Sequence, residues 1–203
     1  MRQRNGGAPE SISRRRFIKR AISAGIFGAA PIIIPASAWA RMHVRSRIDS
    51  HADSSARALS FDNLHTGEKL NTVYWEHGQY IPDGLDKINY ILRDFRRNEI
   101  KPIDPRLLDL LVALRSRLGT EAPYEVISGY RSPVTNAMLH ARSEGVALHS
   151  MHVEGRAIDI NVPGRSLRIL HLAALSLRGG GVGYYPRSNF VHVDTGRVRQ
   201  WGS

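Results

Sequence analysis

Two apolar stretches, each typical of a buried strand, carry ionisable side chains, and this feature constrains the fold most. The stretch 157–160 contains Asp159, and the stretch 190–194 contains His192. A carboxylate or an imidazole in such a setting is costly unless it is paired or bound to a metal. His152 stands shortly before Asp159 in the chain. If the three side chains converge, they form a metal site and the chain is a metallohydrolase.

The ligand set and its neighbours fit zinc chemistry. One carboxylate and two imidazoles suit Zn²⁺, and a catalytic zinc site keeps its fourth position open for water. Gly155 lies between His152 and Asp159 and allows the backbone to turn toward an ion. Strand alternation places His192 and Asp194 on one face, so Asp194 is a candidate to orient an imidazole or to hold a proton. Each residue taken alone is also compatible with an ordinary core or turn position.

Composition narrows the class of protein. A chain of 203 residues with 42% hydrophobic content suits one globular domain and an accessory segment. The absence of cysteine excludes disulfides, iron–sulfur clusters and cysteine-ligated zinc. Residues 1–40 hold seven Lys and Arg against one acid, which leaves +5 of the net charge of +11 to residues 41–203. This moderate basicity fits either an anionic polymer or a simple solvated surface.

The N-terminal segment has the features of an export signal. Residues 13–19 match the twin-arginine pattern, and the apolar run 21–35 is shorter than the roughly 20 residues that span a membrane. Small residues follow, so signal cleavage after Ala38 or Ala40 is expected. We therefore predict a twin-arginine signal peptide (1–40), a polar linker (41–57) and a folded domain (58–203), with the membrane involved only during export.

Periodicity predicts an α+β fold for the mature chain. Alternating residues at 58–64 and 69–75 indicate a β-hairpin. Helices are predicted, from caps and apolar faces, at 83–97, 106–118, 134–143 and 166–177. Further strands are predicted at 124–128, 157–160, 182–185 and 190–194. Because regular βαβ alternation is missing, we expect a small, mostly antiparallel sheet with helices packed on it.

The order of the motifs resembles a known family. The pattern carried by Ser150, His152, Gly155, Ala157 and Asp159, and then by His192 and Asp194, is similar to that of the zinc D-Ala-D-Ala peptidase superfamily. Within it the chain resembles most the murein endopeptidase K family, whose flanking motifs are similar to residues 128–133, 183–186 and 189–196. The resemblance covers 58–201, which is essentially the mature domain.

The resemblance implies a hedgehog/D-Ala-D-Ala-peptidase-like fold in which His152, Asp159 and His192 bind Zn²⁺. It also implies hydrolysis of amide bonds in peptidoglycan crosslinks during cell-wall remodelling. Zinc polarises the scissile carbonyl and lowers the pKa of its water to about 7. Arg131 is then the expected donor to the developing oxyanion; alternatively, it is a surface arginine that binds the wall.

The general base departs from the family pattern. Many relatives carry an acidic residue three positions before the last zinc histidine, and here that residue is Asn189. Asp194, by its strand face, and His149, by its proximity and because histidine as a residue type can exchange a proton near neutral pH, are equally good candidates for the base. Glu154 is a third.

Two other kinds of function remain open. A zinc D,D-carboxypeptidase or D,D-endopeptidase would share the metal site and differ in the bond that is cut. A non-catalytic cell-wall-binding domain that keeps zinc for structure would explain Asn189. Nucleic-acid binding is not expected, because the mature chain is only moderately basic and the export signal leads to the periplasm.

Overall fold

One eight-stranded sheet organises the computed structural model, which describes residues 56–143 and 145–202. The strand order is β3-β2-β1-β4-β5-β7-β6-β8. The strands are β1 (Arg57–Asn63), β2 (Lys69–Glu76), β3 (Gln79–Tyr80), β4 (Tyr124–Ser128), β5 (Ala157–Asn161), β6 (Gly181–Tyr185), β7 (Phe190–Asp194) and β8 (Arg199–Trp201). The predicted signal peptide, and the predicted linker up to residue 55, lie outside the described residues.

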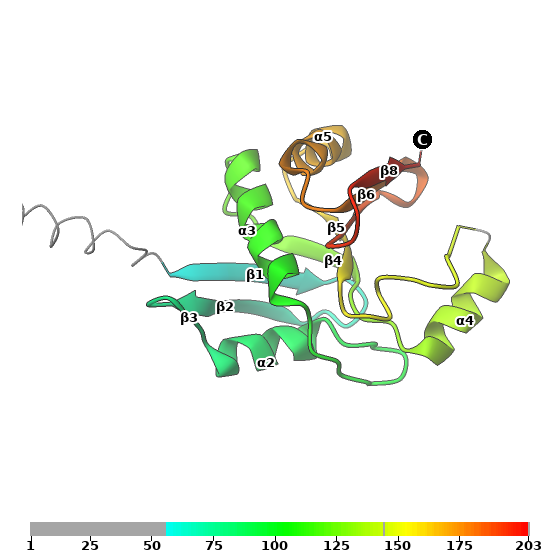
Figure 1. Cartoon of the computed structure of the whole chain (residues 1–203), viewed down its shortest axis with the longest axis horizontal. Coiled ribbons are helices and arrows are strands. Elements are labelled where there is room, and N and C mark those ends of the chain that lie inside the picture. The colour runs from blue at the N-terminus through cyan, green and yellow to red at the C-terminus, as the bar shows by residue number, and fades with distance from the viewer. Residues whose placement is uncertain (1–55, 144, 203) are drawn as a thin grey trace, which may run out of the picture. The chain divides into compact units, whose positions relative to one another are not determined.

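Four α-helices complete the α+β fold of this part of the chain. They are α2 (Pro82–Ile91), α3 (Pro105–Leu118), α4 (Pro133–Arg142) and α5 (Leu167–Leu177), with a short 3-10 turn at Pro186–Ser188. Helix α2 packs on β2, while α3 contacts both β1 and α5. Within the part of the chain that the structure describes, Figure 1 shows α4 on the right and β3 on the left.

The predicted hairpin is confirmed, but the predicted sheet type is wrong. β1 and β2 are antiparallel, as expected. The sheet is nevertheless mixed, because β1 runs parallel to β4 and β6 runs parallel to β8. The first parallel pair joins strands that are separated in sequence by two helices, and the second uses a three-residue strand. Neither pairing leaves a local pattern in the sequence.

Helix α2 is shorter than its periodicity indicates. It ends at Ile91 instead of Arg97, because the chain turns after Leu92 and Asp94 forms a bridge with Glu99. The helix also begins one residue before the predicted cap: Pro82 occupies the first turn, and Asp83 lies there without capping it. The other helices lie within one residue of their predicted bounds.

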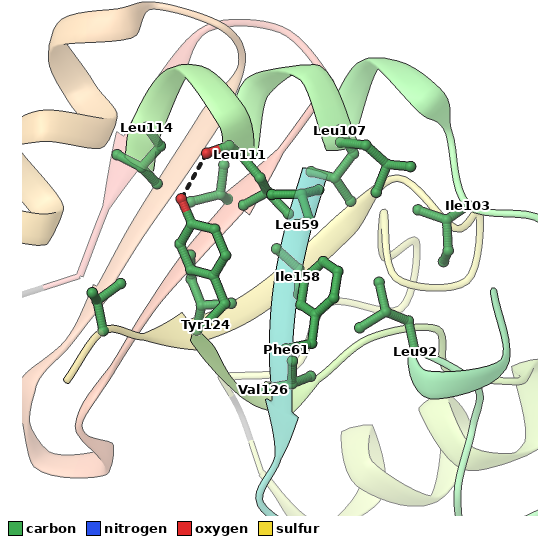
Figure 2. Close-up of a cluster of buried hydrophobic side chains, with 14 of the residues drawn as sticks. Leu59, Phe61, Leu92, Ile103, Leu107, Leu111, Leu114, Tyr124, Val126 and Ile158 are labelled. Carbon is green, nitrogen blue, oxygen red and sulfur yellow. Dashed lines mark hydrogen bonds between the residues drawn. The ribbon is translucent and has the colours of Figure 1, made fainter. Parts of the chain in front are cut away.

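The core lies between α3 and the middle of the sheet. Apolar side chains of α3 point toward those of β1, β4 and β5, and all of the residues in this cluster are buried. Figure 2 shows Tyr124 with its hydroxyl group reaching α3, where it donates a hydrogen bond to the carbonyl oxygen of Leu111 (2.7 Å). At roughly 1.5–3 kcal/mol for each large apolar side chain, this burial gives a rigid support to β5 and β7.

Candidate metal centre and its pocket

Three side chains from separate segments converge on one point. Asp159 on β5 stands directly across the antiparallel pair from His192 on β7. His152 reaches the same point from the turn that precedes β5. The distance from Asp159 Oδ1 is 3.2 Å to His152 Nε2 and 2.9 Å to His192 Nδ1, and the two nitrogens are 3.1 Å apart. The structure therefore brings together the three residues that the sequence predicts as metal ligands.

Hydrogen bonds on the outer edges of the rings orient both imidazoles. His152 Nδ1 donates to the carbonyl oxygen of Gly129 (2.6 Å), which can only accept. His192 Nε2 donates to Asp194 Oδ2 (3.0 Å). Each ring therefore turns its other nitrogen toward Asp159. Such second contacts are typical of metal-bound histidines, because they set the tautomer and the ring orientation.

Burial and charge fit a site that prefers a cation. His152, Asp159 and His192 are all buried. Burial lowers the pKa of His152, which favours the neutral form that binds metals. Burial by itself would raise the pKa of Asp159, but contacts with the two imidazoles hold it well below its ordinary value. Burial would also lower the pKa of His192, yet hydrogen bonds to Asp159 and Asp194 raise it.

The turn after β4 supports the site from one side. The backbone N–H of Arg131 donates to the carbonyl oxygen of His152 (3.2 Å), and its side-chain Nε donates to Ser128 Oγ (2.8 Å). Its Nη2 donates to Asp159 Oδ2. The second carboxylate oxygen is thus held by Arg131, and Oδ1 faces the histidines.

A pocket of roughly 410 Å³ opens onto this cluster. The loop before His152 forms one wall, and Tyr185, Phe190 and Trp201 form an aromatic wall. The rings of Tyr185 and Phe190 are stacked with centroids 4.6 Å apart. Arg131 and Arg199 add positive charge to the lining. The lining therefore offers both an aromatic surface and polar, partly charged groups to a ligand.

The three candidates for the general base differ in their burial and in their position relative to the pocket. His149 is exposed and lines the pocket. Asp194 is fully buried, and it bonds the edge of His192 that faces away from Asp159. Glu154 is paired with Arg156 and is not part of the pocket lining.

Two residues of the site were missed from the sequence, and both lie on β8. Arg199 donates to both oxygens of Asp194, with Nη2 to Oδ2 at 2.7 Å and Nη1 to Oδ1 at 3.1 Å. The ring of Trp201 lies 5.1 Å from that of His192. The only signal in the sequence was Trp201, an aromatic residue shortly after the apolar strand 190–194. A single aromatic residue does not show which strand it would pair with.

Comparisons with known proteins agree with this geometry. A family model described as peptidoglycan L,D-endopeptidase MepK matches residues 51–201. A curated protein with this name from Escherichia coli K12 is 45% identical over 189 residues, which cover 93% of this chain and 97% of the relative. A probable peptidoglycan L,D-endopeptidase MepK from Haemophilus influenzae is 46% identical over 146 residues, covering 71% and 78% of the two chains. No solved structure matches the chain.

Proposed function

The chain belongs to the peptidoglycan L,D-endopeptidase MepK family, and we propose that it is a zinc-dependent endopeptidase that hydrolyses amide bonds in peptidoglycan crosslinks. The observation that carries this proposal is the convergence of His152 Nε2, His192 Nδ1 and Asp159 Oδ1, which all lie within 4.8 Å of one another. The pocket that opens onto them supports a peptide substrate.

The three residues fit zinc by the chemistry of their donor atoms. Two imidazole nitrogens and one carboxylate oxygen form a set that catalytic zinc sites use, and it leaves a position for water. When the two imidazoles are neutral and their outer nitrogens donate to Gly129 and Asp194, the lone pairs are on the inner nitrogens, which face Asp159. Three electron-rich atoms at such close distances, in a buried setting, favour a cation between them.

Arg131 is suited to the developing negative charge. A zinc ion bound here would act as a Lewis acid on the scissile carbonyl and make water more acidic. Arg131 lines the same pocket, and only 13% of its side chain is exposed. Its contacts with Ser128 and Asp159 fix the guanidinium before substrate arrives. A preorganised donor of this kind stabilises an oxyanion without further reorganisation.

His149 is the best placed of the three base candidates. It lies in the pocket wall, three residues before His152, and it is exposed. Asp194 has its oxygens engaged by His192, Arg199 and backbone N–H groups. We therefore assign His149 the acceptance of a proton from the attacking water, and Asp194 the orientation of His192.

The proposed place of action is the periplasm, reached by twin-arginine export. Support comes from the substrate class of the relatives and from the arginine motif at 13–19, followed by the apolar run and the small residues at 36–40. No helix in the part of the chain that the structure describes is long and apolar enough to cross a membrane. Changing Arg14 and Arg15 to Lys and fractionating the cells tests the route, with retention in the cytoplasm as the expected result.

Digestion of purified muropeptides tests the activity. The protein is incubated with dimers that are crosslinked either 3-3, between an L and a D centre, or 4-3, between two D centres. We expect cleavage of the 3-3 dimer, loss of cleavage with a chelator, and recovery when Zn²⁺ is added back. The His192→Ala variant is expected to remain inactive with added Zn²⁺.

Three results would contradict the proposal. Cleavage that resists chelation would exclude the metal. Release of terminal D-Ala without splitting of dimers would indicate a carboxypeptidase. Binding to the wall that survives His192→Ala, with no turnover of any substrate, would indicate a non-catalytic domain.

A further inference from the structure

The short strand β8 reaches the metal centre through Arg199. Its guanidinium and the carboxylate of Asp194 form a two-pronged ion pair, with distances of 2.7 and 3.1 Å. The side chain of Arg199 is 30% exposed, whereas that of Asp194 is fully buried. Two parallel bonds between these planar groups fix the orientation of one relative to the other, which a single bond does not do.

The two oxygens of Asp194 are held differently. Oδ1 accepts bonds from the backbone N–H groups of Gly181 (3.1 Å) and Gly196 (2.8 Å) as well as from Arg199. Among the described residues, only Arg199 and His192 Nε2 donate hydrogen bonds to Oδ2. The oxygen that orients His192 is therefore the one whose position depends most on Arg199.

Trp201 on the same strand packs beside the His192 ring, with the ring centroids 5.1 Å apart and the planes tilted by 54°. It stands across from Gly183 in the parallel pair with β6, and its indole N–H donates to the hydroxyl of Tyr185 (2.7 Å). A Cβ atom at Gly183 would lie 2.8 Å from the indole ring, so the absence of a side chain there makes room for it. The guanidinium of Arg199 lies 4.7 Å from the centre of the same ring.

We propose that Arg199 is a positioning residue of the metal centre, which holds Asp194 so that Asp194 holds His192 with Nδ1 toward Asp159. The proposal rests on the proposed function, because it concerns the same metal site. It assigns to β8 a role that no local sequence pattern indicates. Arg199 has a hydrogen bond to none of the three atoms that would bind the ion, so it acts through Asp194.

Zinc affinity of the metal-free protein tests this role without any measurement of catalysis. The apparent Kd for Zn²⁺ is measured by competition with a coloured chelator at neutral pH. The proteins are the wild type, Arg199→Ala, Arg199→Lys, Asp194→Asn and the Arg199→Ala/Asp194→Asn double variant. Arg197→Ala is the matched control, since this neighbouring arginine is exposed and contributes only its backbone carbonyl to the contacts of Arg199.

We expect Arg199→Ala to weaken zinc binding about 10-fold, the lower end of the effect of removing an outer contact to a ligand. Lysine keeps the charge but lacks the planar fork, so Arg199→Lys should restore only part of the loss. Arg197→Ala should bind as the wild type does. Because Arg199 acts through Asp194, the double variant should bind no more weakly than Asp194→Asn.

Two outcomes would overturn the inference, and they differ from failure of the proposed function. Wild-type affinity in both Arg199 variants, with only a lower Tm, would make Arg199 a purely structural residue. A double variant about 10-fold weaker than Asp194→Asn would exclude action through Asp194. A wild-type protein that does not bind Zn²⁺ at all would instead overturn the proposed function and this inference with it. If Arg199→Ala does not fold, Arg199→Lys decides between the outcomes.

Discussion

His192 donates from Nε2 to Asp194 Oδ2 at 3.0 Å, on the side of the ring opposite to the nitrogen that faces Asp159. The two residues are neighbours on one face of β7, so the alternation of the strand creates the contact. The carboxylate of Asp194 therefore lies on the side of His192 away from the position where a metal ion would bind. This geometry suits orientation of the His192 ring better than acceptance of a proton from the attacking water.

Asp194→Asn separates these two roles. If Asp194 orients His192, the variant should bind Zn²⁺ about 10–100-fold more weakly than the wild type and should recover part of its activity in excess Zn²⁺. Calorimetric titration of the metal-free protein with Zn²⁺ measures this effect. Asp86→Asn, at an exposed position of α2, is the control and should bind as the wild type does. If Asp194→Asn binds Zn²⁺ as tightly as the wild type but has lost its activity, the result would indicate that Asp194 is the base.

His149→Gln tests the base that we propose. The expected result is a fall in kcat of about 10²–10⁴-fold, the usual contribution of a positioned proton acceptor, with zinc content unchanged. Steady-state cleavage of a crosslinked dimer and metal analysis of the same sample give both quantities. His77→Asn serves as the control, because His77 is exposed, lies outside the pocket and has a positive φ of 52° that asparagine tolerates. A kcat within twofold of the wild type would exclude His149 as the base.

Arg131→Lys tests the proposed oxyanion donor against simple binding of the wall. Lysine keeps the positive charge but cannot hold Ser128 and Asp159 while also pointing a donor into the pocket. We expect kcat to fall about 10²–10³-fold, with a smaller change in KM. A higher KM with an unchanged kcat would mean that Arg131 contributes to substrate binding alone.

Local patterns in the sequence predicted the parts of the site that depend on strand alternation. Asp159 and His192 stand in apolar strands, where the cost of burial indicates a partner. Gly155 was expected to allow a turn, and it has a φ of +69°. Each of these properties depends on residues that are close together in the chain, so a single sequence is enough to find them.

Pairing between distant strands could not be predicted in the same way. Arg199 and Trp201 lie on a strand of three residues, too short to show alternation. Its parallel pairing with β6 depends on space at Gly183, which only the folded structure reveals. Likewise, α2 stops at Ile91 because the following residues make tertiary contacts that override an apolar helical pattern. The outcome for helix α2 shows that local propensity is a weak guide where packing decides.

Gly84→Ala measures this conflict between propensity and packing. In an isolated helix, replacing glycine by alanine gains about 1 kcal/mol. In this fold a Cβ atom at Gly84 would lie 2.2 Å from the carbonyl oxygen of Val73 and 2.9 Å from Tyr74 Cα, so the helix has to move away from β2. Overpacking of this kind costs about 1–3 kcal/mol, and we expect a net fall in Tm of several degrees. Thermal unfolding by circular dichroism checks the sign, with Ser116→Ala on the exposed face of α3 as the control. A rise in Tm for Gly84→Ala would contradict the packing argument.

Asp94 should make the stability of the domain depend on pH in the acid range. Its buried carboxylate accepts bonds from the backbone N–H (2.9 Å) and the hydroxyl (2.7 Å) of Ser132, and from the backbone N–H of Arg96 (3.0 Å). Burial alone would raise the pKa of Asp94, but hydrogen bonds from Thr135 and Ser132 hold it below its ordinary value. Since the folded pKa is lower than the unfolded value of about 3.9, charged Asp94 stabilises the fold above about pH 4.

That stabilisation should be lost as the pH falls through the folded pKa of Asp94. The Asp94→Asn variant cannot carry the charge, so its Tm should be lower than that of the wild type at pH 6, and the difference should shrink below pH 4. Loss of charged hydrogen bonds at a buried site costs about 1–3 kcal/mol, which sets the size of the difference at pH 6. Thermal unfolding of both proteins between pH 3 and 7 measures it. Parallel curves with a constant difference across this range would show that Asp94 contributes through its shape and not through its charge.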